Sequence, residues 1–256
     1  MTALADLLPP TAPEWLGGSV VLLGEYGSTA TGTATASSDR DFMGVAVEPR
    51  AYVLGLRRFE HQQISARDPQ AANANADDEG VICGLRKWAN LAAQGNPTVL
   101  SSLFLPHYAV LDEIGTALLE NRNLFLSRRL AARFRGYLVS QRSALTGEKV
   151  KRVQRPELVA AHGYDTKYAH HMLRLGMQGV ELLADGTLTL PMSAPRLDIL
   201  NAVRAGEWLL ADVLALAAVY ETQLTEFATT SAVAEHPDAA KLDALLADTY
   251  DAAWAR

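Results

Sequence analysis

The hydrophobic pattern of this chain changes character near residue 112, and this change constrains the fold more than any other feature. Before it, apolar runs of strand length alternate with turns and helical stretches, as in "SVVLLG", "FMGVAVEP" and "RFEHQQIS". After it, strand signals nearly vanish, and stretches of helical periodicity follow one another with Gly and Pro between them. We therefore expect an α+β fold, with strands and helices in an N-terminal domain, 1–115, and an all-helical C-terminal domain, 116–256.

The segment between the expected strands and this boundary contains a loop and two helices. The polar stretch "ARDPQAANANADD" is rich in turn formers and predicts a loop. Residues 80–94, "GVICGLRKWANLAAQ", carry apolar side chains at helical spacing and predict a helix. A second helix is expected to begin at Pro97, because Asn96 is a good N-cap and the first helical position does not use the N–H that proline lacks.

Composition excludes several classes of protein. Cys83 is the single cysteine, so an internal disulfide and a cysteine-rich metal site are excluded, and the thiol is expected to be buried. The first residues, "MTALADLLPP", contain no basic side chain, and Asp212 interrupts the most apolar later run. We therefore expect neither a signal peptide nor a membrane span, and a cytoplasmic location. Nothing in the sequence indicates an oligomeric state.

Basic residues are concentrated in one segment, although the net charge is −6. Between Arg122 and Arg155 there are ten Lys and Arg residues and one acid, Glu148. Composition alone favours solvated helix faces, and the alternative is a site for phosphates. Both interpretations stay open at the level of the sequence.

The stretch "GSTATGTATASSDRDFMGV", residues 27–45, carries the strongest chemical signal. Asp39 and Asp41 are two residues apart at the start of an expected strand, so both side chains lie on one face with Cα atoms roughly 7 Å apart. Two close carboxylates repel each other unless a cation lies between them. A pair of Mg²⁺ ions, with Mn²⁺ as the alternative, would remove this conflict and serve in-line phosphoryl or nucleotidyl transfer.

The pair Gly27-Ser28 adds a means of holding phosphates. It follows an expected strand, and a turn there exposes backbone N–H groups, while "TATG" is expected to begin a short helix. Gly27 would let a phosphate approach the backbone closely, and Ser28 would donate a hydroxyl hydrogen bond to it. Gly27-Ser28 and the pair of aspartates are each a common surface turn when taken alone. Their order in the chain, with a strand before and a strand after, is much more specific.

Gly27-Ser28, ten residues, Asp39-x-Asp41 and the strand "FMGVAV" together resemble the active-site signature of the DNA polymerase beta-like nucleotidyltransferase superfamily. Nearly the whole chain is similar to a bacterial and phage family of predicted nucleotidyltransferases. The shared stretches are "GS…SDRDFMGV", "LRKWANLAAQGNPTVL", "HGYDTKYAHHMLRLG", "VRAGEW" and "HPDAAKLDALL". The resemblance implies a mixed-sheet nucleotidyltransferase core followed by helices.

The resemblance also implies a reaction, in which a nucleoside monophosphate moves from a nucleoside triphosphate to an acceptor hydroxyl with release of pyrophosphate. Asp39 and Asp41 would be catalytic and would hold two Mg²⁺ ions. A third carboxylate is implied on a later strand or strand end, which Glu79 matches best, with Asp78 and Asp77 as alternatives. A helix-capping role for these acids stays open.

A polar stripe marks the expected helix "DTKYAHHMLRLGMQGVELL", where five polar side chains recur at helical spacing: Lys167, His171, Arg174, Gln178 and Glu181. Spacing alone favours a solvent-facing stripe. Lys167, His171 and Arg174 match a K-x-x-x-H-x-x-R pattern of the family, which implies contacts to the triphosphate. Arg204 in "VRAGEW" also matches, either as a phosphate contact or as a salt bridge between the domains. His170 turns about 100° away from His171 and is expected to be structural.

The chain departs from the family pattern at positions that concern substrate contacts. Thr29 and Thr31 stand where relatives often carry Arg and an aromatic residue, and Ser101 stands where they often have Glu. The residue between the paired aspartates is usually not arginine, but here it is Arg40. These changes leave the expected metal-binding pair intact.

The acceptor is the open part of the functional prediction. The basic segment 122–155 would suit RNA, including a tRNA end, while a protein or small-molecule hydroxyl fits an acidic chain of this size equally well. No zinc finger, aromatic RNA-binding motif or long basic tail indicates base-specific reading. The alternative from another class is a nucleotide-binding regulatory or toxin–antitoxin component without turnover.

Overall fold

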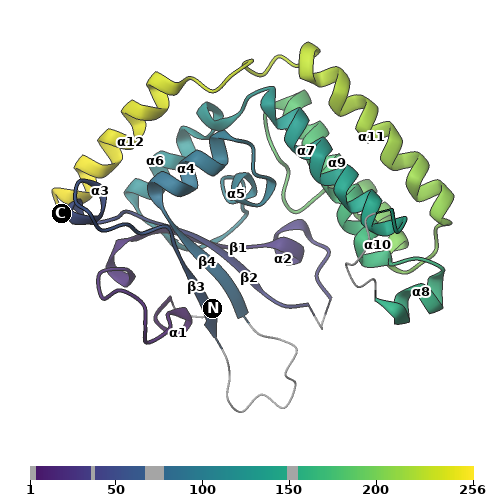
Figure 1. Cartoon of the computed structure of the whole chain (residues 1–256), viewed down its shortest axis with the longest axis horizontal. Coiled ribbons are helices and arrows are strands. Elements are labelled where there is room, and N and C mark those ends of the chain that lie inside the picture. The colour runs from purple at the N-terminus through teal and green to yellow at the C-terminus, as the bar shows by residue number, and fades with distance from the viewer. Residues whose placement is uncertain (1–3, 36–37, 67–77, 149–154) are drawn as a thin grey trace. The chain divides into compact units, whose positions relative to one another are not determined.

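A five-stranded mixed sheet organises the first part of the chain in the computed structural model, which describes residues 4–35, 38–66, 78–148 and 155–256 (Figure 1). The strand order is β3-β4-β2-β1-β5, with β2 and β4 parallel and the other neighbours antiparallel. Helices follow the sheet along the chain, so the expected α+β class is confirmed. The strands are β1 (Val20–Tyr26), β2 (Asp41–Ala46), β3 (His61–Ala66), β4 (Asp78–Gly84) and β5 (Tyr108–Leu111).

Strands β1, β2 and β3 were expected, whereas β4 corrects the prediction of one helix over residues 80–94. Helix α4 occupies only Leu85–Ala93, and the preceding residues form β4. Strand β4 lies between β2 and β3, so both of its edges find backbone hydrogen-bond partners. An apolar run of this length is ambiguous from periodicity alone, and the long-range pairing decides it. Cys83 is buried in β4, as expected.

Both faces of the sheet are covered. On one face, Leu7 and Leu16 from the N-terminal segment pack with Phe42 and Ile82 of the strands. Figure 1 shows α4 and α6 (Glu113–Glu120) on the opposite side of the sheet from α1 (Leu4–Leu7). The shorter elements of this part are η1 (Gly17–Ser19), α2 (Gly27–Thr31), α3 (Arg50–Val53), α5 (Pro97–Ser101) and η2 (Arg122–Phe125).

The last helix, α12 (Ala239–Trp254), belongs with the sheet. The Tyr250 hydroxyl donates to Oε2 of Glu48 at 2.7 Å, and Nε1 of Trp254 donates to the Glu48 carbonyl at 2.9 Å. Glu48 follows β2 and is only 4% exposed. Burial raises the pKa of its carboxyl, although the hydrogen bond from Tyr250 opposes the shift.

The chain forms two compact units, and the contact of α12 with Glu48 explains why the C-terminal segment belongs to the first. The first contains Met1–Ala93, Thr98–Phe125 and Pro237–Arg256, and the second contains Gln94–Pro97 and Leu126–His236. The domains 1–115 and 116–256 remain a prediction, and the compact units differ from them chiefly because α12 packs on the first unit.

The second unit is built around α9 (Thr166–Asp185). The side chain missing at Gly176 lets Tyr220 of α11 approach, and the one missing at Gly179 lets Phe134 of α7 approach, since a Cβ would come within 2.8 Å and 2.7 Å of the Cβ atoms of these two residues. The other helices of this unit are α7 (Arg129–Leu145), α8 (Pro156–His162), α10 (Ala194–Arg204) and α11 (Leu210–Thr230). No helix among the described residues is long and apolar enough to cross a membrane.

Candidate active site

Three segments of the first unit meet at one end of the sheet. β1 ends at Tyr26, whose Cα partner in the antiparallel β2 is Asp41, the first residue of that strand. In the parallel β4, the partner of Asp41 is Glu79. Adjacent strands are about 4.8 Å apart. The turn after β1 and the beginnings of β2 and β4 therefore lie side by side.

Gly27 starts helix α2 and leaves room for the carboxylate of Asp41. Its φ of 69° lies in the left-handed region, which glycine adopts without steric cost. A Cβ at this position would lie 2.6 Å from Oδ2 of Asp41. Ser28 follows in the first turn of α2 and is half-buried. The helix begins two residues earlier than expected, and the two halves of the sequence motif contact each other.

The acidic residues near β2 and β4 fall on different faces of the sheet. Side chains of in-register partners on adjacent strands share a face, so Glu79 shares the face of Asp41. Asp78 is one residue earlier in β4 and faces the other side, where its Oδ2 lies 3.3 Å from Nη1 of Arg40. Asp39 is exposed and precedes β2, which begins at Asp41, so the expectation that the strand contains both aspartates is wrong. Asp77 lies outside the described residues.

Carboxylate oxygens are the ligands that Mg²⁺ prefers, so the donor set of Asp39, Asp41 and Glu79 fits this ion. Within the described part of the chain, no three His, Cys, Asp or Glu side chains already converge on a metal position. Mg²⁺ is usually bound through one or two carboxylates together with water and substrate phosphates, and does not need a complete protein cage. The lack of a side chain at Gly27 lets the Asp41 carboxylate lie beside the turn that would carry the phosphates.

The N-terminus of α9 is organised by Asp165, which the sequence analysis did not single out. Its carboxylate is fully buried and accepts hydrogen bonds from the backbone N–H groups of Lys167 and Tyr168 at 3.0 Å and 3.1 Å. It also pairs with the guanidinium of Arg155 at 3.2 Å. An aspartate directly before a helical run is an N-cap signal that was available in the sequence.

His171 and Arg174 contact each other one turn further along α9. Nη2 of Arg174 lies 2.8 Å from Nδ1 of His171. Arginine can only donate, so Nδ1 accepts and the proton of the neutral ring is on Nε2. Burial lowers the pKa of His171 to about 3, and the charge of Arg174 acts in the same direction. His171 is therefore neutral at pH 7 and can donate a hydrogen bond through Nε2 without adding positive charge.

The polar stripe of α9 is not the solvent-facing stripe that spacing alone favoured. Lys167 at its start is exposed, but Gln178 and Glu181 are 7% and 5% exposed. Glu181 accepts hydrogen bonds from the guanidinium of Arg196 and from the backbone of Thr189. The second half of the stripe thus stabilises the helical unit from inside.

Arg204 ends α10 near the start of α9. Burial and the charge of Arg155 lower the pKa of Arg204, while Asp165 raises it, so these three residues lie close together in the second unit. His170 is 7% exposed and lies in the same field: burial lowers its pKa to about 3, with further lowering by Arg174 and Arg204. Four cationic side chains thus lie in this region: Arg155, Lys167, Arg174 and Arg204.

Much of the basic segment 122–155 is engaged within the helical unit. Arg135 and Arg142 both pair with Glu221 of α11, at 3.3 Å and 2.5 Å. Arg128 donates to the carbonyl of Thr229 at 2.8 Å. These side chains hold α7 to its neighbours, so the charge of the segment is not by itself an indication of an RNA surface. Lys149, Lys151 and Arg152 lie outside the described residues.

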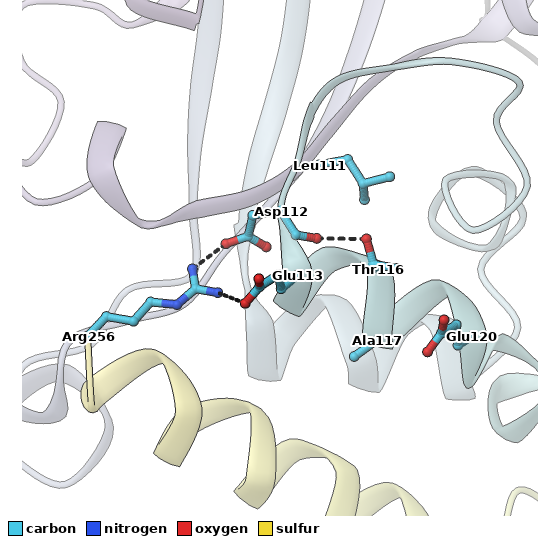
Figure 2. Close-up of a pocket in the computed structure, with 7 residues that line it drawn as sticks. All are labelled: Leu111, Asp112, Glu113, Thr116, Ala117, Glu120 and Arg256. Atoms are coloured by element: carbon cyan, nitrogen blue, oxygen red, sulfur yellow. Dashed lines mark hydrogen bonds and ion pairs between the residues drawn. The ribbon is translucent and has the colours of Figure 1, made fainter.

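The first unit also has a surface pocket of about 680 Å³, which none of the candidate site residues lines. Figure 2 shows its acidic lining, with Asp112, Glu113 and Glu120 on one side and Arg256 opposite. Arg256 pairs with Asp112 at 2.5 Å and with Glu113 at 3.9 Å. An acidic lining repels a triphosphate, so this pocket does not suit the predicted substrate.

Comparison with known proteins agrees with the sequence motif. The model of the RNA repair pathway DNA polymerase beta family matches residues 14–248. A protein of Enterobacteria phage T4, described as an uncharacterized 38.9 kDa protein in the nrdC-mobD intergenic region, is 27% identical over 122 residues. That match covers 46% of this chain and 36% of the phage protein, so the chain spans about a third of the length of this relative.

A solved structure is also similar to the chain. It is a nucleotidyltransferase-like protein from Exiguobacterium sibiricum 255-15, which is 10% identical, with a TM-score of 0.31. The match covers 83% of this chain and 69% of that protein.

Proposed function

Because the chain belongs to the RNA repair pathway DNA polymerase beta family, we propose that it transfers a nucleoside monophosphate from a nucleoside triphosphate to a hydroxyl group of RNA. The acceptor oxygen forms a bond to the α-phosphorus, the bond from that phosphorus to the bridging oxygen of the β-phosphate breaks, and pyrophosphate leaves. The observation that carries the proposal is the contact of Gly27 with Asp41, which has Glu79 as its neighbour in β4. The turn that would hold the phosphates thus adjoins two carboxylates.

Asp39, Asp41 and Glu79 are the residues that would hold two Mg²⁺ ions, or Mn²⁺ in their place. When bound, such ions supply positive charge that stabilises the charge developing on the phosphate oxygens. A carboxylate that holds no ion can take the proton of the acceptor hydroxyl. The backbone N–H groups of the turn at Gly27 and the hydroxyl of Ser28 would hold the β- and γ-phosphates.

The residues that we propose for the second unit supply charge and one neutral donor. Lys167, Arg174 and Arg204 would bind phosphate oxygens through charge-assisted hydrogen bonds. His171 would add a hydrogen bond from Nε2, because its ring is neutral and Nδ1 is occupied by Arg174. Single replacements of Lys167 and Arg204 by alanine should then raise KM for the triphosphate more than they lower kcat.

The RNA acceptor is supported by the description of the family and not by the basic segment. Arg128, Arg135 and Arg142 of that segment are engaged within the second unit. A protein or small-molecule hydroxyl therefore belongs in the experiment as a competing acceptor.

The experiment follows the label of a triphosphate into acceptors. Total RNA and total protein are incubated separately with Mg²⁺ and triphosphate labelled at the α- or the γ-phosphate. We expect α-label in RNA and no γ-label. Asp39→Asn combined with Asp41→Asn should abolish transfer, whereas Asp243→Asn, an exposed acid of α12, should keep it.

Full transfer by the double variant would refute the assignment of the carboxylates. Label in protein and not in RNA would refute the acceptor. A non-catalytic nucleotide-binding component would be stabilised thermally by a triphosphate with Mg²⁺ but would transfer no label to any acceptor.

A further inference from the structure

Arg40, between the two aspartates of the motif, is the centre of a charged triad. Its Nη2 and Nε lie 2.9 Å and 3.2 Å from Oε2 of Glu25, and its Nη1 lies 3.3 Å from Oδ2 of Asp78. Its guanidinium also lies over the ring of Phe42, 5.0 Å from the centroid. The side chains of Glu25 and Asp78 are only 20% and 17% exposed, so these ion pairs are partly shielded from water. We call Glu25, Arg40 and Asp78 the charged triad.

The charged triad lies on the face of the sheet opposite to Asp41 and Glu79. Strand side chains alternate between faces, and Arg40, Phe42 and Asp78 are each one residue away from those carboxylates. The contact with Phe42 supports this placement, because Phe42 packs in the core cluster with Leu7 and Leu16. Arg40 therefore faces away from the carboxylates that would hold the ions.

Each member of the charged triad is close in sequence to a proposed site residue. Glu25 is two residues before Gly27, Arg40 lies between Asp39 and Asp41, and Asp78 is next to Glu79. The backbone supports the same connection, because the carbonyl of Arg40 accepts a hydrogen bond from the N–H of Glu79 at 2.9 Å. One guanidinium thus links the three segments that carry the turn and the carboxylates.

We propose that Arg40 is a positioning residue, which acts through Glu25 and Asp78 to hold the carboxylates of Asp39, Asp41 and Glu79 in the arrangement that binds divalent ions. This inference rests on the proposed function of those carboxylates. The guanidinium also offsets part of the repulsion among the acids gathered at this end of the sheet.

Two expected effects separate this role from a direct substrate contact. The loss of Arg40 should weaken the binding of ions. It should leave the affinity for the triphosphate at saturating ion nearly unchanged, because a residue on the opposite face has no access to phosphates held at Gly27. Groups that orient metal ligands typically change metal affinity by about 10- to 100-fold when they are removed.

The test measures Mn²⁺ binding directly, by the electron paramagnetic resonance signal of the free ion, in the full chain without nucleotide. We expect Arg40→Ala to raise the half-saturating Mn²⁺ concentration about tenfold. Arg40→Lys keeps the charge but cannot bridge two carboxylates with a fork of donors. Its half-saturating Mn²⁺ concentration should therefore lie between those of the wild-type chain and Arg40→Ala. Glu25→Gln should also raise the half-saturating Mn²⁺ concentration. Arg40→Ala combined with Glu25→Gln should raise it no further than Arg40→Ala alone, because both changes break the same ion pair.

Tyr250→Phe is the matched control. It removes a hydrogen bond at Glu48, beyond the other end of β2, and should leave Mn²⁺ binding unchanged even where it lowers the melting temperature. At saturating Mn²⁺, KM for the triphosphate of Arg40→Ala should stay within about twofold of the wild-type value.

The outcomes separate this inference from the proposed function. Unchanged Mn²⁺ binding by Arg40→Ala and Glu25→Gln overturns the positioning role, even where the wild-type chain transfers label. A raised KM for the triphosphate with unchanged Mn²⁺ binding also overturns it, in favour of a direct substrate contact. If the wild-type chain binds Mn²⁺ with the expected dependence on Arg40 but transfers no label, the positioning role stands and the proposed function fails.

Discussion

The carboxylate of Asp41 lies against the Cα of Gly27, where a Cβ would come within 2.6 Å of Oδ2. This contact joins two residues that are 14 positions apart in the chain. Gly27 meets two requirements there, since it adopts a φ of 69° and leaves space for the carboxylate. The contact is therefore the most direct point at which the proposed site can be tested.

Replacement of Gly27 by alanine should disturb both the backbone and Asp41. We expect the free energy of unfolding to fall by about 1–2 kcal/mol, because a side chain at positive φ is strained. Label transfer should fall by about 100-fold, since a carboxylate displaced by an ångström no longer fits the reacting groups. Urea unfolding and the transfer assay measure the two effects. Gly18→Ala is the control, because a Cβ there meets nothing within 4 Å.

The third carboxylate can be identified by comparing two adjacent acids. Glu79 shares the face of Asp41, whereas Asp78 pairs with Arg40 on the other face. We expect Glu79→Gln to lower kcat by at least about 100-fold, and Asp78→Asn by about tenfold or less, through the charged triad alone. Steady-state kinetics at saturating Mg²⁺ measure both. A larger loss of kcat in Asp78→Asn than in Glu79→Gln would assign the third ligand to Asp78.

The neutral histidines of α9 predict a pH dependence of stability. An unfolded histidine has a pKa of about 6.5, whereas burial holds that of His171 at about 3. As the pH falls below about 6.5, the unfolded chain binds a proton that the folded chain does not, so the free energy of unfolding falls. The slope approaches about 1.4 kcal/mol per pH unit for each such histidine.

Unfolding by urea at several pH values between 5 and 7 measures this slope. His171→Gln should remove about half of it, because His170 contributes in the same way. His107→Gln changes an exposed histidine and should keep the wild-type slope. If His171→Gln also kept it, the buried, neutral state of His171 would be wrong.

The hydrogen bond from Tyr250 to Glu48 predicts how strongly α12 is held. Tyr250→Phe should lower the free energy of unfolding by about 1–2 kcal/mol, because it leaves a buried carboxyl with one partner fewer. Limited proteolysis should then cut within α12 sooner than in the wild-type chain. Tyr137→Phe, at a tyrosine that is 41% exposed, should change neither measurement. An equal effect of both variants would contradict the role of this contact.

Local patterns in the sequence were sufficient for most of the elements. The apolar run at β1, the cap and proline at the start of α5, and the periodicity of α7 and α9 each depend on neighbours within a few residues. The helix predicted over 80–94 was partly wrong for the same reason. Val81 and Ile82 suit a buried strand as well as a helix, and only pairing with β2 and β3 decides between them.

The sequence by itself determined that a glycine turn and two aspartates two residues apart lie between two strands, because each of these strands shows as an apolar run that depends on neighbours within a few residues. Only the tertiary structure decided that Glu79 and not Asp78 accompanies Asp41, that Arg40 links Glu25 to Asp78, and that α12 returns to Glu48. These relationships depend on strand register and on contacts between residues as many as 206 positions apart. A one-residue slip in register exchanges the two faces of a strand, and no local pattern in the chain fixes it.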